Sequence, residues 1–194
     1  YKIIIDGLMS KTVLITGCSS GFGLISAARL SSQGYNVYSS MRDLSKCNDL
    51  QLELDRMGAN CHIIELDVCD DNSIQKAIKK ITEKESKLDI LINNAGYGIG
   101  GFFEDLSEKE IRDQFETNFF GVQKVTRAAL PLMRKTAKES MDMFSTKIIN
   151  ISSAQGRSAL PGLGAYGSSK FALEGFSEGS NFELYPFGIE VVLL

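Results

Sequence analysis

The sequence predicts a single doubly wound α/β domain, in which helices cover both faces of one parallel sheet. Strand and helix signals alternate along the 194 residues with short connections, a pattern typical of parallel sheets. Hydrophobic residues make up 43% of the chain and charged residues 23%, which indicates an ordinary globular protein. No linker, repeat or change of composition divides the chain, and its length favours one domain.

The first half of the chain contains four predicted strands and the helices between them. Each strand is a short apolar run, and each helix has apolar residues at intervals of three and four. Gly34 follows the first helix, where glycine is typical of a helix end. The predicted strands are 12–16, 36–40, 61–66 and 88–93, and the apolar helix positions are Leu24, Ile25, Ala28 and Leu30, then Leu50, Leu54 and Met57, then Ile74, Ala77, Ile78 and Ile81.

The second half is predicted to add two strands and two longer helices. Ser107 and Glu110 have the spacing of a capping box, so a helix begins there and runs, with or without a break, to about Arg134. Pro186 and Gly188 then indicate where the last helix ends. The remaining predicted segments are a polar loop at 136–146, a strand at 147–152, a helix at 166–185 and a strand at 189–194.

Both ends of the sequence carry expectations of their own. Met9 opens the run MSKTVLITG, so we expect residues 1–8 to lie upstream of the natural start and the domain to span 9–194. Residues 189–194 read IEVVLL, which is typical of a strand buried on both faces. A chain that stops there leaves an apolar edge uncovered, so we expect a truncated C-terminal part or a partner that covers this edge.

The composition excludes several classes of function. With 21 basic and 24 acidic side chains the net charge is −3 and there is no basic block, so we expect neither nucleic acid nor an anionic membrane as a partner. No apolar run is long enough to predict a membrane span. The cysteines lack zinc-ligand spacing, so we expect no bound metal and the reduced thiols of a cytoplasmic protein. The four are Cys18, Cys47, Cys61 and Cys69.

A glycine-rich loop, TGCSSGFG over residues 16–23, follows the first predicted strand and precedes a helix. Glycine lets a backbone turn tightly and approach a pyrophosphate, and the helix N-terminus offers free N–H groups to it. The loop therefore predicts the dinucleotide site of a Rossmann-type domain. Its spacing is not GxGxxG, and a strand–helix turn without a ligand is the alternative. The candidate contacts are Gly17, Ser19, Ser20, Gly21, Phe22 and Gly23.

Three further motifs follow along the chain. They are NNAG at 93–96, Ser153 at the end of the fifth strand, and Tyr166 with Lys170, which share one helix face at a spacing of four. With the glycine loop they resemble the short-chain dehydrogenase/reductase family, whose patterns are TGxxxGxG, NNAG, a serine and YxxxK. The resemblance covers residues 10–194. The segments VYSSMRDL, SKFALEGFSE and PFG make it nearest to the 17β-hydroxysteroid dehydrogenase and retinol dehydrogenase-like branch.

The resemblance implies hydride transfer between a nicotinamide and a carbonyl or alcohol, with Tyr166 as the general acid/base. A free phenol has a pKa near 10, which an ammonium one helical turn away, on Lys170, should lower. In the family this lysine also bonds the nicotinamide ribose. Ser153 would position the substrate oxygen, and Asn118 would support a water-mediated proton relay. Taken singly, each of these residues suggests packing or surface exposure, and only their joint spacing favours a catalytic set.

The end of the second strand predicts the cofactor. It carries no acidic residue at its tip but ends on Arg42, whose guanidinium matches a 2′-phosphate, so the sequence favours NADP(H) over NAD(H). A surface pair of Arg42 with Asp43 is the alternative. By the resemblance, Asp67 and Val68 contact the adenine, unless Asp67 caps a helix, a role that Asp70 or Asp71 could take instead. The resemblance also places Asn94, Ala95 and Gly96 beside the cofactor.

The resemblance leads to three further expectations. Family members continue after the sixth strand into a substrate-covering segment and a last strand, which this sequence lacks, so we expect the parent protein to be the enzyme. Its substrate would be a secondary alcohol or a ketone or aldehyde, with apolar ones among the candidates. The alternative is a non-catalytic NADP(H)-binding module or an inactive fragment of such an enzyme. An epimerase or dehydratase of the extended branch is disfavoured, because those enzymes usually have the pattern TGxxGxxG, which this sequence does not match. Family members assemble into dimers or tetramers, partly through the YxxxK helix, so we expect a homodimer or homotetramer.

Overall fold

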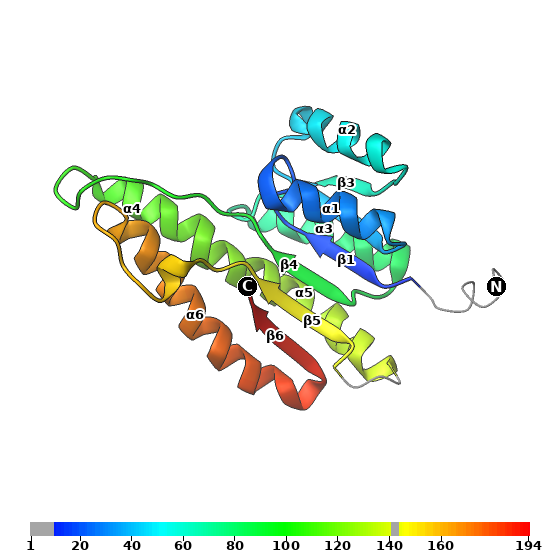
Figure 1. Ribbon diagram of the computed structural model, residues 1–194. Helices are drawn as coiled ribbons and strands as arrows, with labels where there is room; N and C mark the ends of the chain where they lie inside the picture. Colours follow the sequence, from blue (N-terminus) through cyan, green and yellow to red (C-terminus); the bar gives the residue numbers. More distant parts are fainter. Residues whose placement is uncertain (1–9, 141–143) are drawn as a thin grey trace.

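The computed structural model describes residues 10–140 and 144–194, and a parallel six-stranded sheet forms its centre (Figure 1). The strand order β3-β2-β1-β4-β5-β6 confirms the predicted doubly wound, Rossmann-type sheet. The expectation for residues 1–8 lies outside the described residues. The strands are β1 (Thr12–Ile15), β2 (Asn36–Met41), β3 (His62–Glu65), β4 (Ile90–Asn93), β5 (Thr146–Asn150) and β6 (Ile189–Leu193).

Helices cover the sheet on both faces because side chains of a strand alternate between them. In β1, Val13 and Ile15 pack into the core beneath α1 and α2, whereas Leu14 packs into the core beneath α3 and α5; all three are fully buried. None of the described helices is long and apolar enough to span a bilayer. The helices are α1 (Gly21–Ser32), α2 (Asn48–Met57), α3 (Asp71–Glu85), α4 (Glu108–Phe115), α5 (Gly121–Glu139) and α6 (Gly164–Leu184).

The order of the strands sets the position of the site. The chain runs outward from β1 to β3 and then returns to β4, so the direction reverses between β1 and β4, where such sheets bind ligands beyond their carboxyl ends. The segments that follow β4 and β5 extend together from this end of the sheet (Figure 1), and the amide of Gly101 donates to the carbonyl of Gly162 at 2.8 Å. The motifs singled out above therefore gather at one end of the molecule.

The long helical region begins as predicted but ends later. Ser107 and Glu110 form the capping box, and a π-helical segment, η2 (Glu116–Phe120), separates α4 from α5. The polar loop predicted from residue 136 is wrong at its start, because α5 continues to Glu139. Thr136 is buried there and its hydroxyl accepts from the amide of Leu88 at 2.9 Å, so a polar residue faces the sheet. Residues 141–143 of the predicted loop lie outside the described residues.

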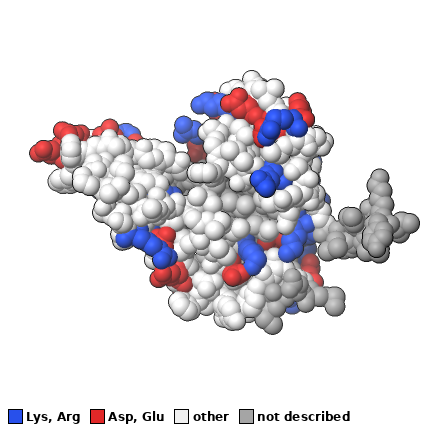
Figure 2. All heavy atoms as spheres, viewed as in Figure 1, with Lys and Arg blue, Asp and Glu red and all other residues white. Residues whose placement is uncertain are grey.

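Strand β6 lies at the edge of the sheet and pairs with β5 alone. Ile189 is fully buried, but the rest of the strand is half-buried, so the prediction of burial on both faces is wrong for most of its length. An apolar run indicates a strand, but the position of that strand in the sheet, central or at the edge, decides how much of it is covered. The face shown in Figure 2 is mostly uncharged, with lysine, arginine and acidic residues scattered over it.

Candidate active site

The glycine loop lies between the carboxyl end of β1 and the start of α1. Gly17 has φ +73°, in the left-handed region, and a Cβ there would lie 2.7 Å from the Cα of Ala95. A Cβ on Gly23 would lie 2.3 Å from the carbonyl oxygen of Gly17 and 2.4 Å from Nδ2 of Asn94. These approaches explain why two of the predicted glycines occupy these positions.

The loop is hydrogen-bonded to the NNAG segment that follows β4. Asn94 donates from Nδ2 to the carbonyls of Thr16 and Gly17, at 2.9 and 3.1 Å. The hydroxyl of Thr16 accepts from the amides of Asn94 and Ala95, both at 3.0 Å. In the sequence, Thr16 stands at the start of the glycine-loop motif but has no predicted role of its own; the structure shows that it is buried and bonds to NNAG.

The tyrosine and lysine of the YxxxK motif project from the first turns of α6. Lys170 is 7% exposed and donates from Nζ to the carbonyl of Ile151 at 2.7 Å. Burial lowers the pKa of Lys170 to about 8. Its Nζ lies 5.9 Å from the centroid of the Tyr166 ring, and a Cβ on Gly98 would lie 3.4 Å from that ring. The structure thus brings Tyr166, Lys170 and the segment after β4 together.

Ser153 lies in the turn between β5 and α6. It precedes η3 (Ala154–Gly156), a short 3₁₀ helix, and its Oγ accepts from the amide of Gln155 at 3.2 Å. Two residues earlier, the carbonyl of Ile151 accepts the hydrogen bond from Lys170, so the turn that contains Ser153 is connected to the YxxxK helix. The side chain is half-buried, at the same end of the sheet as the glycine loop.

Asn118 lies in the π-helical segment η2 and is 1% exposed. Its Nδ2 donates to the carbonyl of Tyr97 at 2.8 Å and to Oγ of Ser169 at 3.1 Å, and its Oδ1 accepts from the amide of Tyr97 at 3.1 Å. Asn118 therefore links the segment after β4 to the helix residue beside Lys170. Ser169 was not singled out from the sequence, because a serine within a helix carries no distinctive signal.

The residues that the sequence predicts to contact the adenosine part of the cofactor lie at the ends of β2 and β3. Arg42 follows β2, is exposed, and makes no hydrogen bond or ion pair with any residue that the structure describes. Asp43 instead accepts from the amide and hydroxyl of Ser45, at 3.0 and 2.6 Å, and these bonds are the main reason why its pKa is lowered. Arg42 and Asp43 therefore form no direct ion pair, although the charge of Arg42 is the smallest of the causes that lower the pKa of Asp43.

Asp67 and Val68 follow β3. Asp67 accepts from the amide of Cys69 at 2.9 Å, whereas Asp70 caps α3 by accepting from the amide of Asn72 at 2.9 Å. The capping alternative for Asp67 is therefore wrong, and Asp70 takes that role. Val68 is buried, and a Cβ on Gly121 would lie 2.8 Å from its Cγ2.

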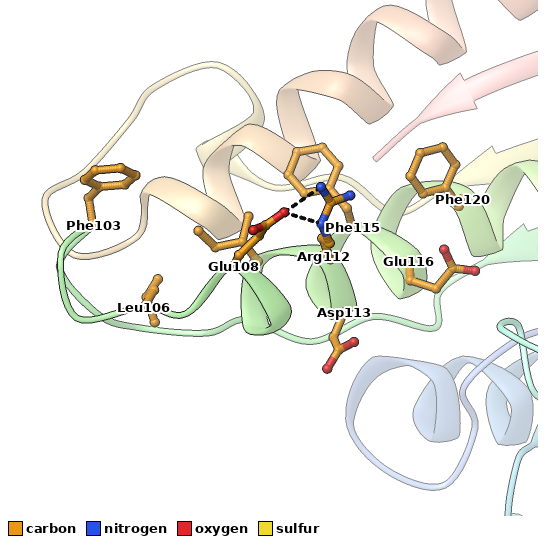
Figure 3. A pocket seen from close by; sticks show the side chains of 9 residues that line it. Phe103, Leu106, Glu108, Arg112, Asp113, Phe115, Glu116 and Phe120 are labelled. Atoms are coloured by element: carbon orange, nitrogen blue, oxygen red, sulfur yellow. Dashed lines mark hydrogen bonds and ion pairs between the residues drawn. The ribbon is translucent and has the colours of Figure 1, made fainter.

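An apolar cavity of about 760 Å³ lies along α4 (Figure 3). Phe103 and Phe115 line it together with the ion pair between Glu108 and Arg112. A second cavity of about 530 Å³ adjoins it and reaches the start of α6. Neither of these two cavities is lined by Ser153, Tyr166 or Lys170. The first cavity is lined by Phe103, Leu106, Glu108, Ile111, Arg112, Asp113, Phe115, Glu116 and Phe120.

Comparisons with known proteins agree with this geometry. The model of the short chain dehydrogenase family matches residues 11–194. The chain is 41% identical to 3-ketodihydrosphingosine reductase of Bacteroides thetaiotaomicron over 96% of this chain and 63% of that protein. It is 37% identical to retinol dehydrogenase 8 of Homo sapiens, over 95% of this chain and 57% of that protein.

Solved structures share the fold as well. A short-chain dehydrogenase from Streptomyces avermitilis superposes with a TM-score of 0.83 at 36% identity, over 95% of this chain and 65% of the other. Similar structures include one solved with NADPH and one solved with NAD. The chain spans about 63% of the length of the first curated relatives that it matches. A family model that covers nearly the whole chain, together with the four motifs gathered at one end of the sheet, establishes that this protein belongs to the short-chain dehydrogenase/reductase family.

Proposed function

We propose that the protein is an NADP(H)-dependent oxidoreductase that interconverts a secondary alcohol and a ketone or aldehyde. The observation that carries this proposal is the buried Lys170, whose Nζ lies 5.9 Å from the ring centroid of Tyr166 beside the glycine loop and NNAG. A protein that only binds a nucleotide does not need this tyrosine. The relatives named as a reductase and a dehydrogenase support the same class of reaction.

The loop fits a dinucleotide. Gly17 and Gly23 leave no room for a Cβ because the NNAG segment and the loop's own backbone fill that space, and this packing fixes the loop. Gly21 has φ +58° and open space beside its Cα, where a pyrophosphate can approach the backbone closely. The N-terminus of α1 has no side-chain cap and no acidic residue in its first turn, so its free N–H groups and positive dipole end are open to phosphate oxygens. The proposed pyrophosphate contacts are completed by Ser19, Ser20, Gly21 and Phe22. The opposite wall of the proposed cofactor site is formed by Asn94, Ala95 and Gly96.

When bound, the nicotinamide cofactor supplies or accepts the hydride at the substrate carbon. In the reducing direction, Tyr166 donates its hydroxyl proton to the carbonyl oxygen, so that the ketone becomes an alcohol; in the oxidising direction, Tyr166 takes the proton back. The ammonium of Lys170 stabilises the phenolate that remains and bonds the nicotinamide ribose. Ser153 turns from the amide of Gln155 to the substrate oxygen, and Asn118 supports the water that relays the proton.

Arg42 carries our proposal of NADP(H). Its exposed guanidinium forms no hydrogen bond or ion pair with a described residue and stands at the end of β2, next to the position of the adenosine ribose in such folds. A 2′-phosphate would accept two hydrogen bonds from it. Asp67 and Val68, at the end of β3, are proposed to contact the adenine.

The names of the relatives favour an apolar substrate. One is a reductase of 3-ketodihydrosphingosine and another a dehydrogenase of retinol. Both names denote molecules with long apolar chains, so we propose an apolar carbonyl compound or its alcohol as the substrate class.

We further propose that the protein associates with itself through α6. Phe171 and Phe182 lie on one side of this helix, three turns apart, and are 47% and 79% exposed. Exposed aromatic residues arranged in this way are typical of an interface between proteins.

The test of the reaction is turnover of a panel of apolar ketones and aldehydes by the full-length protein with NADPH. We expect Tyr166→Phe to lower kcat by at least about a hundredfold, because it removes the transferred proton, and to leave the affinity for NADPH unchanged. Tyr185→Phe is the matched control, since Tyr185 is exposed at the far end of α6. NADPH binding without turnover of any compound would instead support a non-catalytic binding module.

A further inference from the structure

A third side chain follows Tyr166 and Lys170 on the same face of α6. Glu174 comes four residues after Lys170, and its side chain is only 13% exposed. Its Oε2 accepts from Nε of Arg157 at 3.2 Å and lies 3.1 Å from Nη2 of the same residue. The mechanism above uses the first two residues of this face and leaves the carboxylate without a role.

Arg157 closes the short turn that Ser153 opens. Ser153 precedes η3 and Arg157 follows it. Two hydrogen bonds hold the turn. The amide of Gly156 donates to the carbonyl of Ser153 at 2.8 Å, and the amide of Arg157 donates to the carbonyl of Ala154 at 3.2 Å. The guanidinium is thus connected to the serine through one compact, hydrogen-bonded turn.

Gly156 brings the turn into direct contact with Glu174. A Cβ on Gly156 would lie 2.9 Å from Cγ of Glu174 and 2.8 Å from Oγ of Ser152. Only glycine allows the backbone of the turn to lie this close to the helix side chain. Glu174 therefore holds the turn in two ways, by packing against Gly156 and by pairing with Arg157.

We propose that Glu174 is a positioning residue that fixes the turn bearing Ser153 relative to Tyr166 and Lys170 on α6. The expected effect on the rate rests on the proposed function, whereas the expected effect on the structure of the turn does not. Because Arg157 is 74% exposed at its side chain, the ion pair contributes little to stability. A displaced serine, in contrast, would affect the rate strongly, since reacting groups must be held within a fraction of an ångström.

The experiment compares Glu174→Gln with wild type in the full-length protein. Glutamine keeps the shape that packs against Gly156 but loses the charge that holds Arg157. Glu183→Gln is the matched control, because Glu183 is exposed on the opposite side of α6 and forms no ion pair with a described residue. The readouts are hydrogen–deuterium exchange at the amides of Gly156 and Arg157, the affinity for NADPH, and kcat and KM for a carbonyl substrate.

We expect exchange at these two amides to become about two- to fivefold faster in Glu174→Gln, the range set by an ion pair with one exposed partner, with unchanged affinity for NADPH and an unchanged pH profile. The value of kcat/KM should fall by on the order of tenfold. In a Ser153→Ala background the same substitution should have little further effect on kcat/KM, because the group that it positions is absent. A general loss of stability would not give this dependence on Ser153.

Two results would overturn the inference. The first is unchanged amide exchange in Glu174→Gln, which can be read whether or not the protein turns over a substrate. The second is a fall in kcat/KM that is equally large with and without Ser153. If wild type reduces no carbonyl compound, the proposed function fails, and the exchange measurement alone decides whether Glu174 holds the turn.

Discussion

At the scale of single residues, the polar contacts at the site were decided by which neighbours the fold supplied. Asp67 and Asp70 carry the same chemical group within one segment, and the sequence left the helix cap open between them. In the structure Asp70 binds the amide of Asn72, while Asp67 binds that of Cys69. Asp70 lies immediately before α3 and so reaches the first amides of that helix, whereas Asp67 lies three residues earlier in the preceding turn.

Arg42 gives the first prediction at this scale. In Arg42→Asp the affinity for NADPH should fall by roughly ten- to hundredfold, because a charge-assisted hydrogen bond of about 1.5–3 kcal/mol is lost. The affinity for NADH should change little, since NADH has no 2′-phosphate. Fluorescence titration with each nucleotide measures both, and Arg127→Asp, on exposed α5 surface, controls for the change in charge. Equal losses for the two nucleotides would sink the assignment.

Lys170 gives the second. Burial lowers its pKa from 10.5 to about 8, so in the window between these values the unfolded chain binds more protons than the folded one. The free energy of unfolding should therefore rise with pH across that window. The cost of burying the ammonium, about 3 kcal/mol, is present in full below pH 8 and relieved near pH 10.5.

Urea unfolding at pH 7 and pH 10 without nucleotide tests this prediction. Wild type should gain about 2–3 kcal/mol relative to Lys170→Met over this range, because other titrating groups are common to both proteins. Methionine fills a similar volume and has no charge to bury. Parallel pH profiles for the two proteins would contradict the assignment of the low pKa to Lys170.

At the scale of elements, the glycine loop packs against and is hydrogen-bonded to NNAG, and two of its glycines are points of contact. In Gly23→Ala the new Cβ would meet the backbone oxygen of Gly17 and Nδ2 of Asn94 within 2.4 Å, so the loop must move. We expect a loss of nucleotide affinity of at least about tenfold and a loss of stability of about 1–3 kcal/mol. Titration with NADPH and urea unfolding measure the two effects.

Gly179→Ala is the matched control for that substitution, because a Cβ at this position in α6 meets open space. It should leave nucleotide affinity unchanged and raise stability by about 0.5–1 kcal/mol, the ordinary gain of alanine over glycine in a helix. If Gly23→Ala behaved like this control, the contact between the loop and NNAG would not matter for binding.

Elements were easier to predict than their ends. The capping box at Ser107 fixed the start of α4 because its signal is local. The end of α5 was missed because Thr136 is polar yet buried, with its hydroxyl bonded to the amide of Leu88, a residue that is remote in the sequence. The same applies to β6, whose apolar run predicts a strand but not its place at the edge.

At the scale of the whole molecule, self-association is the property to test. Phe171 and Phe182 present two aromatic rings on the outer side of α6. Sedimentation velocity at micromolar concentration should show a dimer or tetramer for wild type, and the double variant Phe171→Ser, Phe182→Ser should shift toward the monomer because apolar contact area is lost. Leu52→Ser, a change to an exposed apolar residue of α2, should leave the assembly intact. A monomeric wild type would refute the proposal.

The sequence by itself determined the alternation of strands and helices, the glycine loop and the order and spacing of the four motifs. These are local properties, fixed by backbone conformation and side-chain period over a few residues. The tertiary structure alone decided that Thr16 ties the loop to NNAG, that Asn118 reaches Ser169, and that Glu174 holds the turn of Ser153 through Arg157. Such contacts join residues that are distant in the chain, and their geometry follows from how the strands are ordered and the helices packed.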